Sequence, residues 1–163
     1  MSKAEMTLME ELERELFPAF DAGDAEAFEA FVRDRFSTDV EWMLWGWENR
    51  GLDRLLGEWL DQQRAWNPQK HSVLHRVDAG DSAACEVVWS GTHSGPFRLP
   101  GGGEAAATGK TFERRNLIQA WRGPDGKVIK WHVLSAYPEI VAELSELSAP
   151  ETNRALSISL TKA

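Results

Sequence analysis

The chain has 163 residues and a formal net charge of −8, a length that suits one domain with a single buried core and a charge that argues against a nucleic-acid partner. No apolar run approaches the ~20 residues of a membrane-spanning helix, and the charged first residues lack the apolar stretch of a signal peptide. The single cysteine, Cys85, excludes an internal disulfide and fits the reducing cytoplasm, where we expect the protein to reside without membrane contact.

The first part of the chain predicts two helices, a strand and a third helix. Apolar residues recur at helical spacing over residues 7–22, where Pro18 is expected to kink the helix or end it early. Asp24 has the chemistry of an N-cap for a second helix through "AEAFEAFVRDRF". "TDVEWMLWGW" then changes to strand-like composition, and an apolar stripe predicts a third helix with Leu52, Leu55, Leu56, Trp59 and Leu60 on its buried face.

The second part of the chain predicts strands at about 70–79, 82–95, 110–122 and 127–137, separated by Gly- and Asp-containing turns. A closing helix is expected to start near Pro138. Helices followed by antiparallel strands predict an α+β domain over residues 1–150, in which a curved, mostly antiparallel sheet wraps around the N-terminal helices and leaves a pocket at its open end. Residues 151–163 form a weakly patterned C-terminal tail.

The segment "PGGGEAAATGKT", residues 100–111, is superficially similar to a phosphate-binding loop. The spacing G-x-x-x-x-G-K-[ST] requires a glycine at position 104, which is Glu104, and a carboxylate there would repel phosphate. The residues that follow are typical of a strand rather than a helix. The segment is therefore predicted to be a Gly-rich connection between strands.

Eight tryptophans and seven phenylalanines stand out in a chain of this length. They either fill the core or line a cavity suited to a flat, hydrophobic, partly polar ligand. Neither a metal site nor a nucleophilic triad is predicted. His71 and His75 would lie about 13 Å apart along a strand without a carboxylate cluster, and Ser90 and Thr92 lack His–Asp partners.

Three segments together resemble one enzyme family. "RGLDRLLGEWL", "WSGTHSGPF" and "IQAWRGPDGKVIKWHV" are similar, in order and spacing, to segments of the SnoaL-like polyketide cyclases, and the similarity extends from about residue 10 to about residue 147. The resemblance implies a cone-shaped α+β barrel, the fold that this family shares with ketosteroid isomerase, scytalone dehydratase and the nuclear transport factor 2 superfamily. It also implies a homodimer that pairs through the sheet.

The resemblance further implies cyclisation of a polyketide intermediate without metal or organic cofactor, in which an acid/base side chain removes a proton next to a carbonyl. The family's catalytic aspartate falls on Val133, which cannot carry a proton. The neighbouring His132 is the candidate base, although strand alternation places it on the face opposite Trp131 and Val133 unless a bulge re-aims it. Gln119 falls where the family often has a polar pocket residue, so it is the second catalytic candidate.

Further residues are expected to contact the substrate because they share a strand face with the pocket or lie at its mouth. Among them, Arg115 would hold a ligand carboxylate or phenolate if it points inward. The predicted substrate-contacting residues are Trp42, Leu44, Trp89, His93, Arg115, Trp121, Trp131, Val133 and Tyr137.

The sequence thus predicts cofactor-free cyclisation, isomerisation or dehydration of a small hydrophobic or aromatic, polyketide-like substrate. The alternative is a non-catalytic ligand-binding or protein-interaction domain, which the missing aspartate favours. Hydrolase or dehydratase chemistry of the Asp–Arg–Asp or His–Asp type is disfavoured, because no such set is expected to face inward.

Overall fold

The computed structural model describes residues 6–44, 47–99, 103–135 and 137–148. Its N-terminal helical stretch consists of α1 (Leu8–Glu11), a π-helical turn η2 (Leu12–Leu16) and α2 (Phe17–Asp21), which confirms the helix predicted over 7–22. Thr7 begins this stretch as the N-cap, in a reciprocal capping box with Glu10. Pro18 lies in the first turn of α2, directly after the π turn, so the helix continues past the proline instead of ending there.

The other two predicted N-terminal helices are confirmed. In α3 (Ala25–Arg35), the side chain of Asp24 accepts a hydrogen bond from the backbone N–H of Ala27 at 3.0 Å, as an N-cap does. The next helix, α4 (Leu52–Ala65), follows Gly51, whose φ of 98° is in the region that favours glycine. It extends beyond the apolar stripe, and its last turns bury Gln63 and Ala65, with Gln63 hydrogen-bonded to the backbone of α2.

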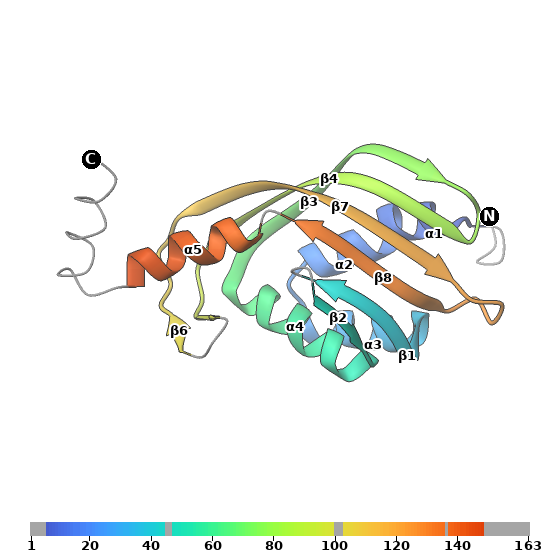
Figure 1. The fold of residues 1–163 in the computed structure, drawn as a ribbon, viewed down its shortest axis with the longest axis horizontal. Helices are drawn as coiled ribbons and strands as arrows, with labels where there is room; N and C mark the ends of the chain where they lie inside the picture. The colour runs from blue at the N-terminus through green and yellow to red at the C-terminus, as the bar shows by residue number, and fades with distance from the viewer. Residues whose placement is uncertain (1–5, 45–46, 100–102, 136, 149–163) are drawn as a thin grey trace.

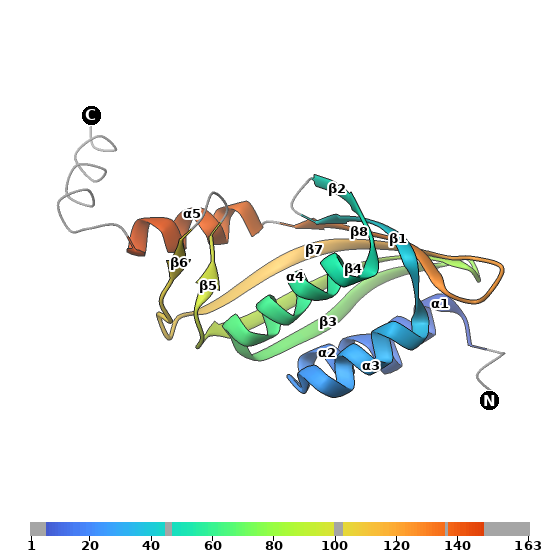
Figure 2. The same cartoon turned by 90° about the horizontal axis from the view of Figure 1, so that it is seen from below.

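The strands form one curved six-stranded sheet, seen from its outer face in Figure 1 and from the side in Figure 2. The order is β2-β1-β8-β7-β4-β3, and every pairing is antiparallel except that of β1 with β8. Its strands are β1 (Phe36–Leu44), β2 (Trp47–Arg50), β3 (Trp66–Asp78), β4 (Ser82–His93), β7 (Thr111–Arg122) and β8 (Val128–Ser135). The predicted α+β class is confirmed, and the sheet wraps around the helices without closing, since β2 and β3 remain its two edges.

Within the predicted Gly-rich connection, β6 (Glu104–Ala105) pairs with β5 (Phe97–Arg98), which precedes it, and residues 100–102 between them lie outside the described part of the chain. The closing helix is α5 (Tyr137–Ser148). Figure 2 shows α5 and the pair of β5 and β6 together at one end of the sheet, away from α1–α3. The predicted tail, 151–163, also lies outside the described residues. Among the described helices, none has both the length and the apolar character needed to span a bilayer.

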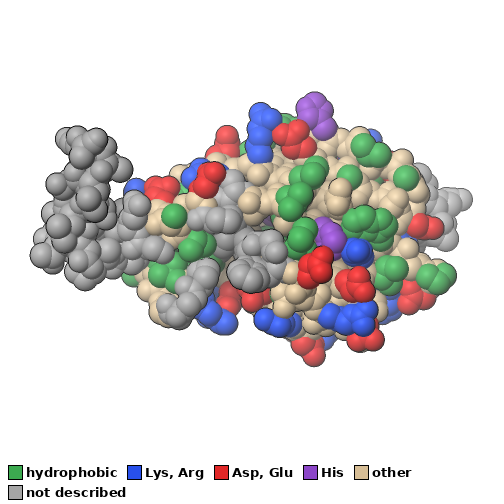
Figure 3. Space-filling model, viewed as in Figure 1, with side chains coloured by type: hydrophobic (Ala, Val, Ile, Leu, Met, Phe, Trp, Pro, Cys, Tyr) green, Lys and Arg blue, Asp and Glu red, His purple; other side chains and the backbone are tan. Residues whose placement is uncertain are grey.

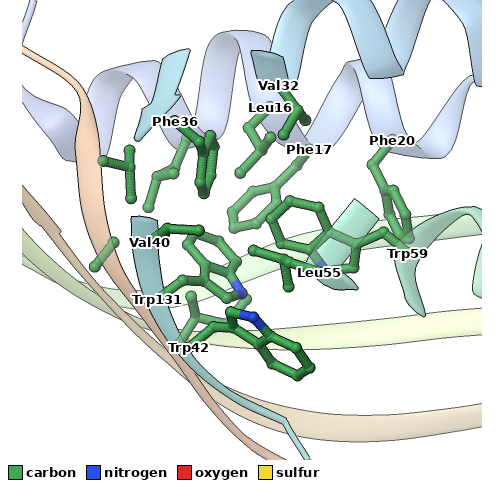
Figure 4. Close-up of a cluster of buried hydrophobic side chains, with 14 of the residues drawn as sticks. Leu16, Phe17, Phe20, Val32, Phe36, Val40, Trp42, Leu55, Trp59 and Trp131 are labelled. Carbon is green, nitrogen blue, oxygen red and sulfur yellow. The ribbon is translucent and has the colours of Figure 1, made fainter. Parts of the chain in front are cut away.

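Buried side chains form two clusters. The larger one joins the helices to the inner face of the sheet, and Figure 4 shows Phe17 and Phe20 of α2, Trp59 of α4 and Trp131 of β8 within it. The rings of Trp59 and Trp131 meet edge to face at 5.5 Å. The smaller cluster lies beneath α5 and is centred on Trp66. Cys85 belongs to the larger cluster, and burial raises the pKa of its thiol to about 12, which fits the predicted role of a strand core residue.

Candidate functional site

A cavity lies between the inner face of the sheet and the helices. Its walls are mainly aromatic and include Phe17, Phe20, Phe28, Trp59, Trp89 and Trp131, and its polar lining consists of Gln62, His71, Arg114, Asn116 and Ser135. The space measures about 60 Å³, several times the ~10–15 Å³ that one water molecule needs. A compact ligand therefore fits as the cavity stands, whereas an extended one requires side chains at its edge to move.

The strand register sets the floor of the cavity. His71 of β3 pairs with Trp89 of β4, and Trp89 pairs with Arg114 of β7, so these three residues form one row across the sheet. Two residues further along β7, Asn116 pairs with Ser135 of β8. Because neighbouring strands are ~4.8 Å apart, the backbones of His71 and Arg114 are about 10 Å apart. An imidazole and a guanidinium thus stand at two ends of one row, with an indole between them.

His71 is held by Asp21, the last residue of α2. Its ring Nδ1 lies 2.6 Å from Asp21 Oδ1, and its backbone N–H donates to Asp21 Oδ2 at 2.7 Å. A carboxylate only accepts hydrogen bonds, so Nδ1 carries the proton and donates, and Nε2 of the neutral ring holds the lone pair. The side chains of His71 and Asp21 are only 8% and 18% exposed.

Surrounding contacts keep this pair in place. The ring of His71 stacks on Phe17 at 5.2 Å and meets Phe20 at 5.6 Å. The carbonyl of Phe20, next to Asp21, accepts hydrogen bonds from the amides of Gln63 at 2.8 Å and Gln69 at 3.4 Å. The end of α2 is thereby tied to both α4 and β3. An imidazole oriented by a buried carboxylate is the arrangement that general bases commonly use.

Four of the predicted substrate-contacting residues line the cavity: Leu44, Trp89, Trp131 and Val133. Their contact with a substrate stays a prediction. Trp42 is buried on β1, and its indole N–H donates to the Gly51 carbonyl at 3.1 Å. His93 is buried beneath α5, beside Trp66. Tyr137 begins α5, and its side chain lies outside the described residues.

The remaining candidates lie on the outer face of the sheet, away from the cavity. Gln119 and His132 are direct cross-strand neighbours, and the ring of Trp121 lies 5.5 Å from that of His132. Arg115 is 71% exposed and pairs with Glu86. The expectation that β7 turns Gln119, Arg115 and Trp121 inward is wrong, because the strand presents the alternate residues Arg114, Asn116 and Ile118 to the cavity.

A bulge that would re-aim His132 is not found at that position. The only irregularity between β7 and β8 lies at the start of β8, and the pairing runs regularly from Lys130 to Ser135. His132 therefore lines a separate outer groove of about 400 Å³, together with Glu41 and Lys130. Partial burial and the nearby Lys130 lower the pKa of His132, against the smaller opposing effects of Glu48 and Glu41. Figure 3 shows charged and hydrophobic side chains interspersed on this face.

None of the polar residues that line the cavity is among the site residues that the sequence predicted. The expectation that no His–Asp set faces inward is also wrong, since His71 and Asp21 form one. Asp21 is separated from His71 by fifty positions, and only the packing of α2 against β3 brings them together. A helix-terminal aspartate carries no periodic signal that would identify its partner. Within the described residues, no three His, Cys, Asp or Glu side chains cluster closely enough to hold a metal ion.

Acid is expected to destabilise the wild-type protein more than a His93→Gln variant. Burial lowers the pKa of His93, because the charged ring would lose its hydration. Between this lowered pKa and the unfolded value of about 6.5, the unfolded chain binds a proton that the folded chain does not. The contribution of neutral His93 to the unfolding free energy is therefore fully present above about pH 6.5. It is lost as the pH drops through the pKa that His93 has in the folded protein.

Urea denaturation at about pH 7.5 and about pH 5 would measure this difference. The loss of unfolding free energy between the two pH values should be larger for the wild type than for His93→Gln. Equal losses would show that His93 does not contribute to the acid sensitivity.

Comparisons with known proteins agree with this fold. Residues 14–131 match the family model of the SnoaL-like domain. No curated protein matches the sequence significantly. A proposed SnoaL-like polyketide cyclase from Jannaschia sp. CCS1 superimposes with a TM-score of 0.69 at 14% identity, covering 92% of this chain and 99% of that chain.

Two further solved structures show the same similarity. IdmH, a proposed polyketide cyclase from Streptomyces antibioticus, superimposes with a TM-score of 0.57 at 24% identity, covering 80% of this chain and 93% of that chain. A proposed polyketide cyclase from Xanthomonas campestris pv. campestris gives a TM-score of 0.60 at 20% identity, with 82% and 93% covered. At these identities the similarity establishes the shared fold, and the chemistry has to be argued from the side chains of the cavity.

Proposed function

Since this chain belongs to the SnoaL-like domain family, we propose that it is a cofactor-free acid–base catalyst that cyclises, isomerises or dehydrates a hydrophobic, polyketide-like molecule in the inner cavity. The observation that carries the proposal is the His71–Asp21 pair, a buried imidazole oriented by a carboxylate and lining an aromatic cavity. The proposed polyketide cyclases among the proteins of the same fold support the substrate class.

The chemistry needs only groups that the cavity contains. Nε2 of His71 takes a proton from a carbon next to a carbonyl, and Asp21 stabilises the resulting imidazolium. The carbanion, delocalised onto its carbonyl oxygen, receives hydrogen bonds from polar lining such as Asn116. Its carbon then attacks a second carbonyl of the same molecule, forming the ring bond, and the new alkoxide takes the proton back from His71. Protons and electrons balance without a co-reactant.

The aromatic walls contribute to this reaction in two ways. They exclude water, so that hydrogen bonds to the developing negative charge are stronger than in solvent. They also restrict a flexible chain to folded conformations in which the two carbonyl groups approach each other. The cavity wall also includes Leu44, Trp131 and Val133. Val133, at the position of the family's aspartate, thus serves packing in this chain, and His71 supplies the base from another strand.

The test is proton removal from carbon in nitrobenzisoxazole, a compact probe whose N–O bond breaks to release a coloured phenolate when a base takes its C–H proton. We expect the wild type to exceed the background rate saturably, and His71→Asn to lower kcat/KM by about 100-fold or more. His75→Asn is the matched control, because His75 lies on the same strand and is 81% exposed. It should retain the wild-type rate.

His132→Asn separates the two candidate bases. Loss of activity in His132→Asn with normal activity in His71→Asn would contradict the proposal and move the reaction to the outer groove. Saturable binding of the probe without any rate above background would support the alternative, a non-catalytic ligand-binding domain.

A further inference from the structure

The cavity has a cation at the end of the row opposite His71. Arg114 lines the cavity from the inner face of β7, and its side chain is 26% exposed, so it stands where the cavity approaches solvent. The guanidinium lies over the ring of Phe112, 5.8 Å from the ring centre. His71 is more enclosed, at 8% exposure. A ligand that enters beside Arg114 therefore reaches the base only after it crosses Trp89.

Arg114 has hydrogen-bonding capacity left over. One Nη1 hydrogen bond goes to the backbone carbonyl of Glu113, at 2.8 Å. Nε lies 3.7 Å from Glu139 and Nη2 lies 3.7 Å from Glu143, distances too long for hydrogen bonds, and both glutamates are at least 40% exposed on α5. Nε is shielded from solvent and has no hydrogen-bond partner among the described residues. A guanidinium offers five donors in a fork that matches a carboxylate.

No described acidic side chain lines the cavity to compensate Arg114 from inside. Glu143 also lies 3.4 Å from Lys110, so its charge is shared with a second cation. An anionic group at the cavity edge would thus meet a positive charge in a partly apolar setting, where the attraction is stronger than at an open surface.

We propose that the ligand of this cavity is a planar carboxylic acid, whose carboxylate binds Arg114, whose conjugated body lies over Trp89 and whose acidic carbon faces His71. The inference rests on the proposed function in taking the inner cavity as the substrate site. It narrows the substrate class to molecules with an acid group and a reactive carbon separated by less than the ~10 Å between the two backbones. The carboxylate-binding role that the sequence suggested for Arg115 is thereby assigned to its inward-facing neighbour, Arg114.

The experiment compares cinnamate with cinnamamide, which have the same planar body and differ in charge, by isothermal titration calorimetry on the wild type and four variants. We expect the wild type to bind cinnamate roughly 10-fold more tightly or better, because a charge-assisted, two-donor contact is lost with the amide. Arg114→Gln should abolish this preference and leave the affinity for cinnamamide within about twofold. Arg114→Lys, which keeps the charge without the fork, should retain part of it.

Arg115→Gln is the matched control, because Arg115 is the adjacent arginine on the opposite face of the same strand. It should keep the full preference. Equal affinities in the wild type, no binding of either probe, or a preference that survives Arg114→Gln would each overturn the inference.

His71→Asn distinguishes this inference from the proposed function. It should keep the preference for cinnamate, since anion binding does not need the base. If the preference is present and nitrobenzisoxazole is not turned over, the proposed function fails and the carboxylate site stands. If turnover depends on His71 but the wild type does not prefer cinnamate over cinnamamide, the carboxylate site fails and the proposed function stands.

Discussion

An Asp21→Asn variant is expected to lose about 10²- to 10⁴-fold in kcat/KM toward nitrobenzisoxazole, with little change in stability or in cinnamate affinity. The reason is the protonation state of the imidazole. In the wild type, Asp21 accepts hydrogen bonds from both Nδ1 and the backbone N–H of His71. The proton is therefore on Nδ1, and the lone pair that removes the substrate proton is on Nε2.

An asparagine at position 21 keeps the shape of the aspartate side chain but reverses the tautomer of the His71 ring. Its single carbonyl oxygen must accept from the backbone N–H, which can only donate, so its NH₂ group faces Nδ1 and donates to it. The ring proton then moves to Nε2, where the base was. Steady-state kinetics with the nitrobenzisoxazole probe would measure the loss directly.

Asp24→Asn is the control for this substitution. Asp24 lies three positions away and caps α3 instead of contacting His71, and asparagine caps helices equally well. Its rate should equal that of the wild type. In addition, the double variant Asp21→Asn/His71→Asn should be no slower than His71→Asn alone, because the two residues act as a unit. An unimpaired Asp21→Asn protein would exclude His71 as the base.

A Glu11→Ala variant is expected to lose about 3–5 kcal/mol of unfolding free energy. The carboxylate of Glu11 bridges Arg35 of α3, at 2.6 Å, and Arg122 of β7. All three side chains are at most 16% exposed. Without the carboxylate, Arg35 would keep its ion pairs with Glu15 and Asp34. The largely buried Arg122 would keep only the exposed Asp81, 3.9 Å away, so its charge would be left poorly compensated. Urea denaturation monitored by tryptophan fluorescence would measure the change.

Glu29→Ala is the corresponding surface control. Glu29 also pairs with an arginine, Arg33, at 2.8 Å, but both side chains are more than 40% exposed, so its removal should leave the stability unchanged within error. If Glu11→Ala and Glu29→Ala behave alike, the buried carboxylate is not what joins α1 to α3 and β7.

Strand alternation predicted the inner faces of β4 and β8 but not that of β7. On β4, Cys85, Val87 and Trp89 are uniformly apolar and all buried. On β8, Trp131 and Val133 face the cavity, and Lys130 and His132 lie on the other face. Both faces of β7 mix polar and apolar residues: Arg114, Asn116 and Ile118 on one, Arg115, Leu117 and Gln119 on the other. Where neither face is the more apolar, composition cannot say which one is buried.

The order and type of the main helices and strands, and the α+β class, follow from local patterns, because hydrophobic spacing, N-caps and turn residues act over a few positions. The site depends on contacts between distant positions. His71 becomes a candidate base only because α2 ends against β3 and places Asp21 beside it, and Arg114 rather than Arg115 reaches the cavity only because of the register of β7 with β4. Such contacts leave no periodic trace in the chain, since they arise when elements fifty residues apart pack on one another.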